Sequence, residues 1–173
     1  MQAGLNGTAF EDKTSLTFQM LELGYVPNAN LGLKSSDETC FYAEQNAAER
    51  LFYKIANSKL WTRPDVLYLA KTESGYTLKI IEMKFQRVPG SVDEKLKCAP
   101  YLVKEYQEMC KGTVVNQVEL AYCISDYLKQ HFFYAETAKA RFWLRVYQEN
   151  GIRLFFGDEP DYKPNVLEWF KSV

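Results

Sequence analysis

Apolar runs in the middle of the chain predict a β-hairpin. Residues 66–70 form a short apolar segment, and residues 76–82 first alternate between polar and apolar positions and then become continuously apolar. The polar residues 73–75, which end in a glycine, are typical of the turn between two antiparallel strands. Short apolar runs predict two more strands, at residues 118–124 and at residues 152–156.

Apolar residues that recur every three to four positions predict helices on both sides of this hairpin. The first helix is expected over residues 5–24, where Gly24 suits the left-handed conformation that commonly ends a helix. Residues 26–38 are rich in asparagine, glycine and serine and are expected to form a loop. The second helix is expected over residues 38–56, with Asp37 as its N-cap. Three further helices are expected at residues 92–111, residues 127–150 and residues 166–171.

This order of elements predicts an α/β fold in which a central mixed β-sheet is flanked by helices. The length of 173 residues, with 47% hydrophobic and 25% charged residues, suits a single globular domain over residues 1–173. No apolar run reaches the roughly 18 residues of a membrane-spanning helix, and the N-terminus lacks the features of a secretory signal. Four cysteines without CxxC spacing are typical of free thiols in a reducing compartment, so we expect a cytoplasmic protein that binds no membrane.

The candidate chemistry lies at the open end of the predicted hairpin. Asp65 directly precedes the first strand, and Glu82 and Lys84 extend the second strand. In a strand Glu82 and Lys84 point to one face of the sheet, whereas Met83 points to the other. If the hairpin forms, two carboxylates and an ammonium meet at one point, an arrangement that can bind a divalent metal and activate water. A simple salt bridge at the rim of the sheet is the alternative, because acidic-x-Lys triplets occur four times in this chain.

The distribution of charge along the chain favours an anionic ligand near this site. The whole chain has a net charge of −1. Residues 50–111 contain twelve Lys or Arg and seven Asp or Glu, a local surplus of five positive charges, whereas the rest of the chain contains nine basic and fifteen acidic residues. A basic region around an acidic site suits a nucleic acid. Ordinary solvated side chains remain the alternative for this composition.

The polar residues of the hairpin resemble the active-site signature of the PD-(D/E)XK nuclease superfamily. The matching residues are Pro64-Asp65 on one strand and Glu82-Met83-Lys84 on the next. That superfamily has the restriction-endonuclease-like fold, a central mixed β-sheet flanked by helices. The resemblance implies that Asp65 and Glu82 bind Mg²⁺, for which Mn²⁺ can substitute, and that the Met83 carbonyl is a further ligand. It also implies that Lys84 orients or deprotonates the attacking water, or stabilises the charge that develops in the transition state.

The residues after the hairpin extend this resemblance. Gln86 and the run Gly90-Ser91, followed by Lys95, are similar to the E-x-K-x-Q … G-S-x-x-x-K pattern of a number of type II restriction enzymes. The resemblance covers roughly residues 5–125 of the chain. It implies that several polar residues around the hairpin contact DNA.

Five residues are candidate DNA contacts. Gln86 is expected on the same face as the Glu-x-Lys triplet, where it could position water or touch a phosphate; a plain polar residue at a strand end is the alternative. Ser91 begins a predicted helix whose free amides and dipole favour anions, and Lys95 adds charge. A simple capping box with solvated lysines is the alternative there. Arg63 and Arg87 flank the strands as candidate contacts to the DNA backbone, with solvated arginines as the alternative.

An additional acidic residue is expected on the first helix. The residues Gly7, Phe10 and Glu11 are similar to the first helix of the family, which often carries a further glutamate. Glu11 is therefore the favoured fourth catalytic residue. Glu49 lies on the helix that is nearer to Asp65 in the sequence, and it remains the alternative because that helix departs from the minimal pattern of the fold.

The resemblance implies an enzyme, an Mg²⁺-dependent DNA endonuclease that hydrolyses phosphodiester bonds without an organic cofactor. The leading version is a type II restriction endonuclease that cuts a short site in double-stranded DNA as a homodimer, because one active site per chain favours two chains for two strands. The alternatives are a non-catalytic nucleic-acid-binding protein that keeps the fold, and a nuclease of the same fold that acts in repair or recombination or on RNA. Aromatic residues make up 15% of the chain, mostly in apolar runs, so core packing is expected for them more than base stacking.

Overall fold

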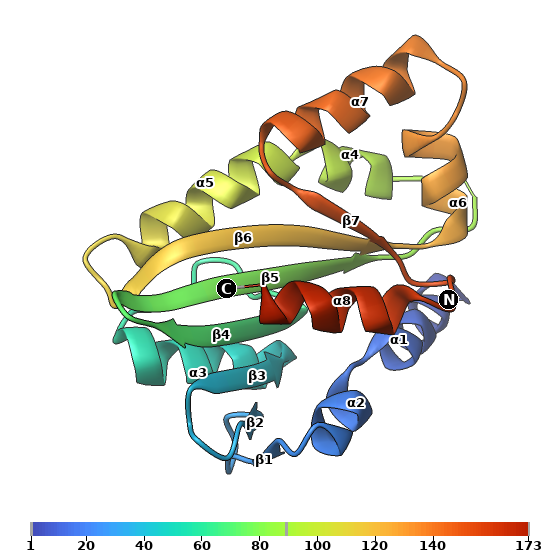
Figure 1. The fold of residues 1–173 in the computed structure, drawn as a ribbon. Coiled ribbons are helices and arrows are strands. Elements are labelled where there is room, and N and C mark those ends of the chain that lie inside the picture. Colours follow the sequence, from blue (N-terminus) through green and yellow to red (C-terminus); the bar gives the residue numbers. More distant parts are fainter. Residues whose placement is uncertain (1, 89, 173) are drawn as a thin grey trace.

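A seven-stranded mixed β-sheet flanked by helices forms the centre of the protein (Figure 1). The computed structural model describes residues 2–88 and 90–172. The strands lie in the sheet in sequence order: β1 (Val26–Pro27), β2 (Leu33–Lys34), β3 (Cys40–Glu44), β4 (Val66–Thr72), β5 (Gly75–Lys84), β6 (Val115–Ile124) and β7 (Arg153–Phe156). The helices are α1 (Gln2–Thr14), α2 (Thr17–Glu22), α3 (Gln45–Ala56), α4 (Val92–Lys97), α5 (Ala99–Cys110), α6 (Asp126–Leu128), α7 (Ala138–Glu149) and α8 (Tyr162–Lys171), with a π-helical turn at Lys129–Phe133. The predicted α/β class, with a mixed sheet between helices, is confirmed.

The predicted hairpin is formed by β4 and β5. The two strands pair antiparallel from Val66 opposite Ile81 to Thr72 opposite Gly75, around the turn that the sequence indicates. Gly75 has a φ of 148°, and a side chain there would meet the Val114 carbonyl oxygen at 2.4 Å, so the turn requires glycine. β6 and β7 then extend the sheet in parallel with β5.

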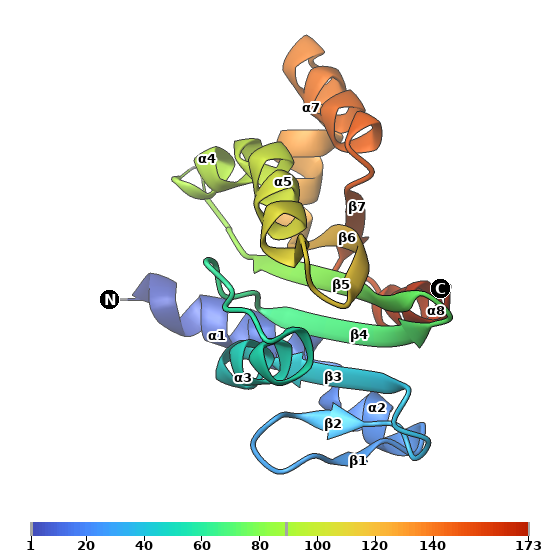
Figure 2. The same ribbon diagram turned by 90° about the vertical axis from the view of Figure 1, so that its left-hand side faces the viewer.

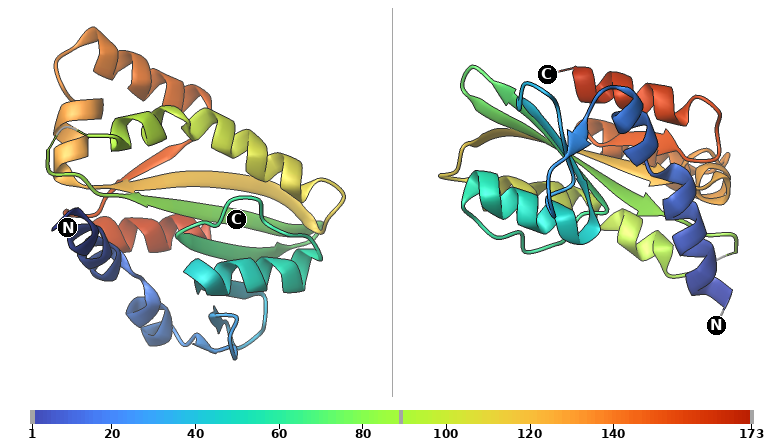
Figure 3. Two further views of the ribbon diagram at one scale, coloured as in Figure 1. Left: turned by 180° about the vertical axis from the view of Figure 1, so that it is seen from behind. Right: turned by 90° about the horizontal axis from the view of Figure 1, so that it is seen from below.

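Each face of the sheet carries its own apolar core. Buried residues of α3, α5 and α7 pack on one face, and buried residues of α1, α2 and α8 pack on the other. The right-hand view of Figure 3 shows α3 on one side of the sheet and α1 with α8 on the other. Alternation along β5 explains the division, because Leu78 and Ile80 belong to the first core while Ile81 and Met83 belong to the second.

The predicted N-terminal helix of residues 5–24 is wrong as a single element. It is divided into α1 and α2 by Thr14 and Ser15, whose hydroxyl groups have other partners. The Thr14 hydroxyl donates to a backbone carbonyl one turn earlier at 2.6 Å, and the Ser15 hydroxyl donates to the Glu44 carboxylate at 2.8 Å. Such side-chain bonds compete with a continuous helix. Gly24 ends the segment with a φ of 86°, as expected.

Two segments predicted as loop and helix contain strands instead. Residues 26–38 include β1 and β2, and residues 38–56 begin with β3 before α3 starts. Asp37 accepts a hydrogen bond from the Thr39 backbone N–H at 3.1 Å within a turn, so it does not cap a helix. The aromatic residues of β3 favour a strand, and all five residues of β3 pair antiparallel with β4.

The helices after the hairpin are interrupted where the sequence predicts continuity. Residues 92–111 form α4 and α5, and Pro100 lies in the first turn of α5, where proline is tolerated. Residues 127–150 form α6, the π-helical turn and α7. β6 and α8 begin earlier than predicted, at Val115 and Tyr162. Within the part of the chain that the structure covers, no helix combines the length and apolar content that a bilayer requires.

Candidate active site

The antiparallel pairing of β4 and β5 places Asp65 beside Glu82. Val66 lies opposite Ile81, so the next pair toward the open end of the hairpin consists of Asp65 and Glu82. Residues directly opposite each other in an antiparallel pair share a face of the sheet. Lys84 follows two positions later on β5 and returns to that same face. The hairpin register alone therefore brings the three charged side chains together.

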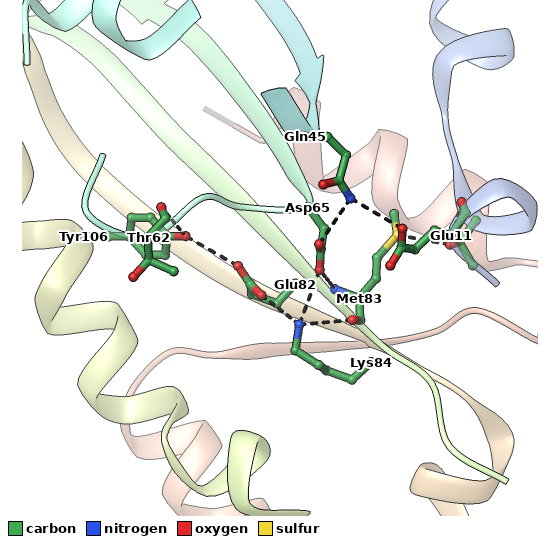
Figure 4. A network of polar contacts seen from close by, with 9 residues as sticks. Glu11, Gln45, Thr62, Asp65, Glu82, Met83, Lys84 and Tyr106 are labelled. Atoms are coloured by element: carbon green, nitrogen blue, oxygen red, sulfur yellow. Dashed lines mark hydrogen bonds and ion pairs between the residues drawn. The ribbon is translucent and has the colours of Figure 1, made fainter. Parts of the chain in front are cut away.

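The Lys84 ammonium lies at the centre of the site (Figure 4). Its Nζ donates to Glu82 Oε2 at 2.8 Å, to the Met83 carbonyl oxygen at 3.0 Å and to Asp65 Oδ2 at 3.3 Å. The side chain of Lys84 is only 16% exposed. Burial disfavours its charge, but the carboxylates of Glu82 and Asp65 together outweigh that effect and raise the pKa of Lys84. The side chain is therefore an ammonium held by three oxygens.

These oxygen atoms fit a divalent cation. The two carboxylate oxygens and the Met83 carbonyl oxygen converge on one point, and in the structure that point carries a positive charge. Mg²⁺ prefers hard oxygen ligands and is commonly held by one or two carboxylates together with a substrate phosphate. Within residues 2–88 and 90–172, no three Asp, Glu, His or Cys side chains form a group that could chelate an ion by themselves.

Asp65 is held in place from two directions. Its Oδ2 accepts a hydrogen bond from the Met83 backbone N–H at 2.7 Å, which fixes the carboxylate against β5. Its backbone carbonyl accepts from the Gln45 N–H at 3.0 Å, and its Oδ1 accepts from Gln45 Nε2 at 3.4 Å. A carboxylate fixed by neighbouring backbone and side chains loses little freedom when it binds a ligand.

Glu82 is the more deeply buried of the two carboxylates. It is 7% exposed, and its Oε1 accepts a hydrogen bond from the Tyr106 hydroxyl at 3.4 Å. Burial raises the pKa of Glu82 above its ordinary value, and the nearby Lys84 ammonium opposes this shift without cancelling it. A buried carboxylate with a perturbed pKa and a specific charged partner is a typical feature of a functional site.

The raised pKa of Glu82 predicts a pH dependence of stability in metal-free buffer. At a pH between the pKa of Glu82 in the unfolded chain, near 4.5, and its higher pKa in the folded protein, the folded protein binds more protons than the unfolded chain. This contribution to the free energy of unfolding is present below pH 4.5 and is lost as the pH rises through the folded pKa. We expect the Glu82→Gln protein to lack this decrease in the free energy of unfolding with rising pH. Urea unfolding of the wild type and of the variant from acid to neutral pH measures the difference. Parallel curves would show that Glu82 is not buried as the structure has it.

Glu11 lies beside Asp65, as the resemblance implies. Gln45 Nε2 donates to Glu11 Oε2 at 3.4 Å and also bonds Asp65, so one amide joins the two carboxylates. Burial raises the pKa of Glu11, and the charge of Asp65 raises it further. Glu49, the alternative, is exposed on α3 and lines a separate hollow with Arg50. The structure therefore brings Glu11, and not Glu49, to the site.

Three residues of this site were not found from the sequence. Gln45 begins α3 with a φ of 50°, and it lay inside a segment predicted as continuous helix. Glu44 accepts from the Ser15 hydroxyl at 2.8 Å and lines the same hollow as Asp65. Tyr106 occupies an ordinary apolar position of α5, so no sequence signal marks its contact with the buried carboxylate. Their roles depend on how β3 and α5 pack, which local patterns do not encode.

Gln86 does not join the polar groups of the site. β5 ends at Lys84, and the Gln86 side chain is buried, with its Nε2 donating to the Val88 carbonyl at 2.5 Å. The Ser125 hydroxyl holds its backbone, accepting from the N–H at 3.2 Å and donating to the carbonyl at 2.9 Å. Gln86 Oε1 is buried without a hydrogen-bond partner in the described part of the chain. The expectation that Gln86 shares the face of Lys84 is wrong, because the strand ends before it.

The capping box predicted at Ser91 is not formed. Ser91 makes no side-chain bond to the start of α4, and Glu94 instead pairs with Lys97 at 2.5 Å. α4 has only six residues, so its N-terminus offers a weak dipole to an anion. Lys95 is exposed and lines a hollow together with Asp65 and the site lysine, so it keeps its place as a candidate phosphate contact.

The two arginines lie at the rim of the site in different environments. Arg63 lies two residues before Asp65 in the sequence, is exposed, and donates to Asn46 Oδ1 at 2.6 Å. Arg87 is exposed and lies over the Phe85 ring, with 5.2 Å between the guanidinium carbon and the ring centroid. Among the residues that the structure describes, neither arginine forms an ion pair with a carboxylate, so both can pair with a phosphate.

Two hollows in the surface meet at Asp65. One, of about 250 Å³, is largely acidic, and the other, of about 290 Å³, contains the lysines of the site. They share Glu11, Asp65 and Met83. The acidic hollow is completed by Asp12, Ser15, Glu44 and Gln45, and the basic one by Gly7, Phe10, Lys84, Phe85, Val92 and Lys95. A cation and an anionic ligand can thus approach the same carboxylate from two sides.

The site combines a buried carboxylate, a half-buried carboxylate and an ammonium at one end of the sheet. Figure 2 shows α1, α4 and the loop before β4 gathered at this end. Comparisons of the chain with protein-family models, with curated proteins and with solved structures find no match.

Proposed function

We propose that this chain is an Mg²⁺-dependent DNA endonuclease. The observation that carries the proposal is the convergence of Asp65, Glu82 and the Met83 carbonyl on the Lys84 ammonium. Buried charges of this kind cost desolvation energy, and a rim salt bridge does not need a second carboxylate and a carbonyl on the same ammonium. Support also comes from the α/β fold and from the resemblance of these residues to the PD-(D/E)XK signature.

Each residue of the site has a part in hydrolysis of a phosphodiester. Asp65 and Glu82 would hold the ion, with the Met83 carbonyl as a further ligand; when bound, Mg²⁺ lowers the pKa of water and polarises the phosphate. Lys84 is a fixed positive charge beside the place where negative charge develops on the phosphate oxygens. Glu11 adds a third carboxylate on the far side of Asp65, where it can accept a hydrogen bond from water.

The surroundings of the site suit a polyanion that enters from the basic side. Lys95 lies in the hollow that leads to Asp65 and Lys84, and it has no carboxylate partner in the described residues. Arg63 precedes β4 and, within the described part of the chain, hydrogen-bonds the neutral side chain of Asn46 and forms no ion pair. These cations can hold the backbone of a nucleic acid on both sides of the reacting phosphate.

The proposal is tested with purified protein and supercoiled plasmid. We expect Mg²⁺ or Mn²⁺ to support conversion to nicked and linear forms, and EDTA to stop it. Asp65→Asn, purified in the same way, should leave the plasmid intact, because the carboxylate shared by both hollows is lost. Glu73→Gln is the matched control, since it neutralises an exposed acid in the β4–β5 turn, at the opposite end of the hairpin from Asp65, and should cut like the wild type. Equal cleavage by the Asp65→Asn protein would overturn the proposal.

The pattern of products distinguishes versions of this function. A restriction endonuclease that acts as a homodimer on a short duplex site gives discrete fragments, because base contacts select the site. A repair or recombination nuclease gives a smear or acts on special structures. Sedimentation of the protein with and without duplex DNA checks whether two chains assemble. A homodimer is expected because each chain has one active site and a double-strand cut needs two.

A further inference from the structure

Two aromatic side chains near the site are exposed, although most aromatic residues of the protein are buried. Tyr101 is 74% exposed and Trp61 is 68% exposed. With Val88, at 67%, they are the three most exposed large apolar side chains in the part of the chain that the structure describes. All three come from segments that surround the candidate site: the loop before β4, the loop after β5 and the first turn of α5. Such exposure in one place indicates a binding surface.

The contacts of the loop before β4 place Trp61 against α5. The Trp61 backbone N–H donates to the Met109 sulfur at 2.8 Å, and the Thr62 hydroxyl donates to the Glu105 carboxylate. Tyr101 lies one turn before Glu105 on the same side of α5, toward α4. The Trp61 backbone is therefore anchored while its indole remains free, and Tyr101 projects from a rigid helix nearby. Figure 2 shows this loop and the start of α5 at the end of the sheet that carries the site.

Positive charges without an ion-pair partner in the described residues lie close to these rings in the sequence or line the hollow of the site. Lys95 and Lys104 are exposed and form no ion pair in the described residues, and Arg63 bonds only the neutral Asn46. Lys104 is three residues after Tyr101 on α5, and Arg63 is two residues after Trp61. A surface of exposed rings alternating with free cations matches a strand whose bases are unstacked and whose phosphates face the protein.

We propose that Trp61 and Tyr101 stack on unpaired bases and that the substrate of the site is single-stranded DNA or a single-stranded segment within duplex DNA. This inference rests on the proposed nuclease function and replaces the regular duplex as its preferred substrate. In a regular duplex the base faces are stacked on each other, so an exposed ring finds a base face only where pairing is open. Proteins that recognise an intact duplex instead present hydrogen-bonding side chains to the edges of the bases in the grooves.

A hollow next to Trp61 extends this surface. Tyr53, which is 54% exposed, lines a space of about 370 Å³ together with Arg50, Lys59 and Leu60. Leu60 directly precedes Trp61, so the hollow lies beside the Trp61 backbone; it contains a further ring, two cations and the Glu49 carboxylate. A strand that passes over the site can therefore find a third ring beyond Trp61.

Binding is measured with the Asp65→Asn protein, which keeps cleavage out of the measurement. The probes are a labelled DNA strand of about 16 nucleotides, which spans a typical site for a single-stranded DNA-binding fold, the duplex of the same sequence, and the RNA strand. We expect the DNA strand to bind at least about fivefold more tightly than the duplex. Trp61→Ala and Tyr101→Ala should each weaken binding of the strand by about 5- to 100-fold. The Trp61→Phe and Tyr101→Phe proteins should stay close to the parent protein, because a ring remains.

Phe18→Ala is the matched control, since Phe18 is 64% exposed on α2, which packs on the face of the sheet opposite to α5. It should leave binding unchanged. Tighter binding of the duplex or of RNA, or equal affinities for the Trp61→Ala and Phe18→Ala proteins, would overturn the inference. If plasmid is cut but these substitutions have no effect, the nuclease function stands and the stacking surface fails. If no nucleic acid is cut but the strand binds through Trp61, the nuclease function fails and the stacking surface stands.

Discussion

Replacing Lys84 by methionine is expected to lower the rate of DNA cleavage by about 10²- to 10³-fold and, in the same protein, to tighten the binding of Mn²⁺. The two effects have one cause. The ammonium lies within 3.3 Å of both carboxylates and of the Met83 carbonyl, so it competes with a cation for the same oxygens. Methionine has a similar length and no charge. Removing a positive charge a few ångströms from an ion should raise affinity for that ion by about tenfold or more.

Plasmid cleavage and calorimetry with Mn²⁺ measure the two effects separately. Asp65→Asn should lose both cleavage and metal binding, because it removes a ligand. Lys95→Met is the matched lysine control: Lys95 lines the same hollow but forms no ion pair with a carboxylate among the described residues. It should weaken DNA binding modestly and leave Mn²⁺ affinity unchanged. A Lys84→Met protein that binds Mn²⁺ no better than the wild type would show that the ion does not use these three oxygens.

The part of the site that the sequence indicates depends on local rules alone. A turn between two apolar runs fixes the register of the hairpin, and period-two alternation then places Asp65, Glu82 and Lys84 on one face. No long-range information enters this step. The same reasoning succeeds for the α/β class, because alternating helices and strands leave few ways to bury both faces of a sheet.

The wrong predictions concern segments whose structure depends on packing against residues distant in the sequence. Residues 38–56 have alanine and leucine at helical spacing, yet the first part pairs with β4, because an edge next to that strand must be filled. Because of this error the sequence did not identify Gln45 as a site residue, although its amide joins Glu11 to Asp65. The prediction for Gln86 failed for a related reason. It assumed that β5 continues past Lys84, whereas the Ser125 hydroxyl holds the Gln86 backbone beyond the end of the strand.

The sequence also does not show which aromatic residues are exposed. From the sequence, Trp61 and Tyr101 cannot be told apart from rings such as Tyr106 and Tyr147, which are fully buried. Their exposure follows from two facts of tertiary structure. The loop before β4 is tied to α5 by its backbone and by Thr62, and α5 turns the face that contains Val103 and Tyr106 toward the sheet, away from Tyr101. A surface of this kind becomes visible only when the elements are placed in space.

Lys79 carries the second large expected effect, on stability. It lies on β5 near the site lysine but faces the opposite core, and its side chain is fully buried. Its Nζ donates to the Trp169 and Ser172 carbonyls at the end of α8, the latter at 2.6 Å, and lies 3.6 Å from the Glu119 carboxylate. Burial lowers the pKa of Lys79, and the Glu119 carboxylate opposes that shift. A cation at a helix C-terminus stabilises it, so Lys79 ties α8 to the strand that carries the site.

Lys79→Ala should lower the free energy of unfolding by about 3 to 5 kcal/mol, because it removes a fully buried side chain together with its charged hydrogen bonds to the Trp169 and Ser172 carbonyls. For a chain of this size that loss corresponds to a Tm lower by about 6 to 20 °C. Lys71→Ala is the matched control, since Lys71 is exposed on β4, and should change stability by less than about 0.5 kcal/mol. Thermal unfolding followed by circular dichroism measures both. Equal Tm values would mean that α8 is held by its apolar face alone, and that β5 positions Glu82 and Lys84 without this anchor.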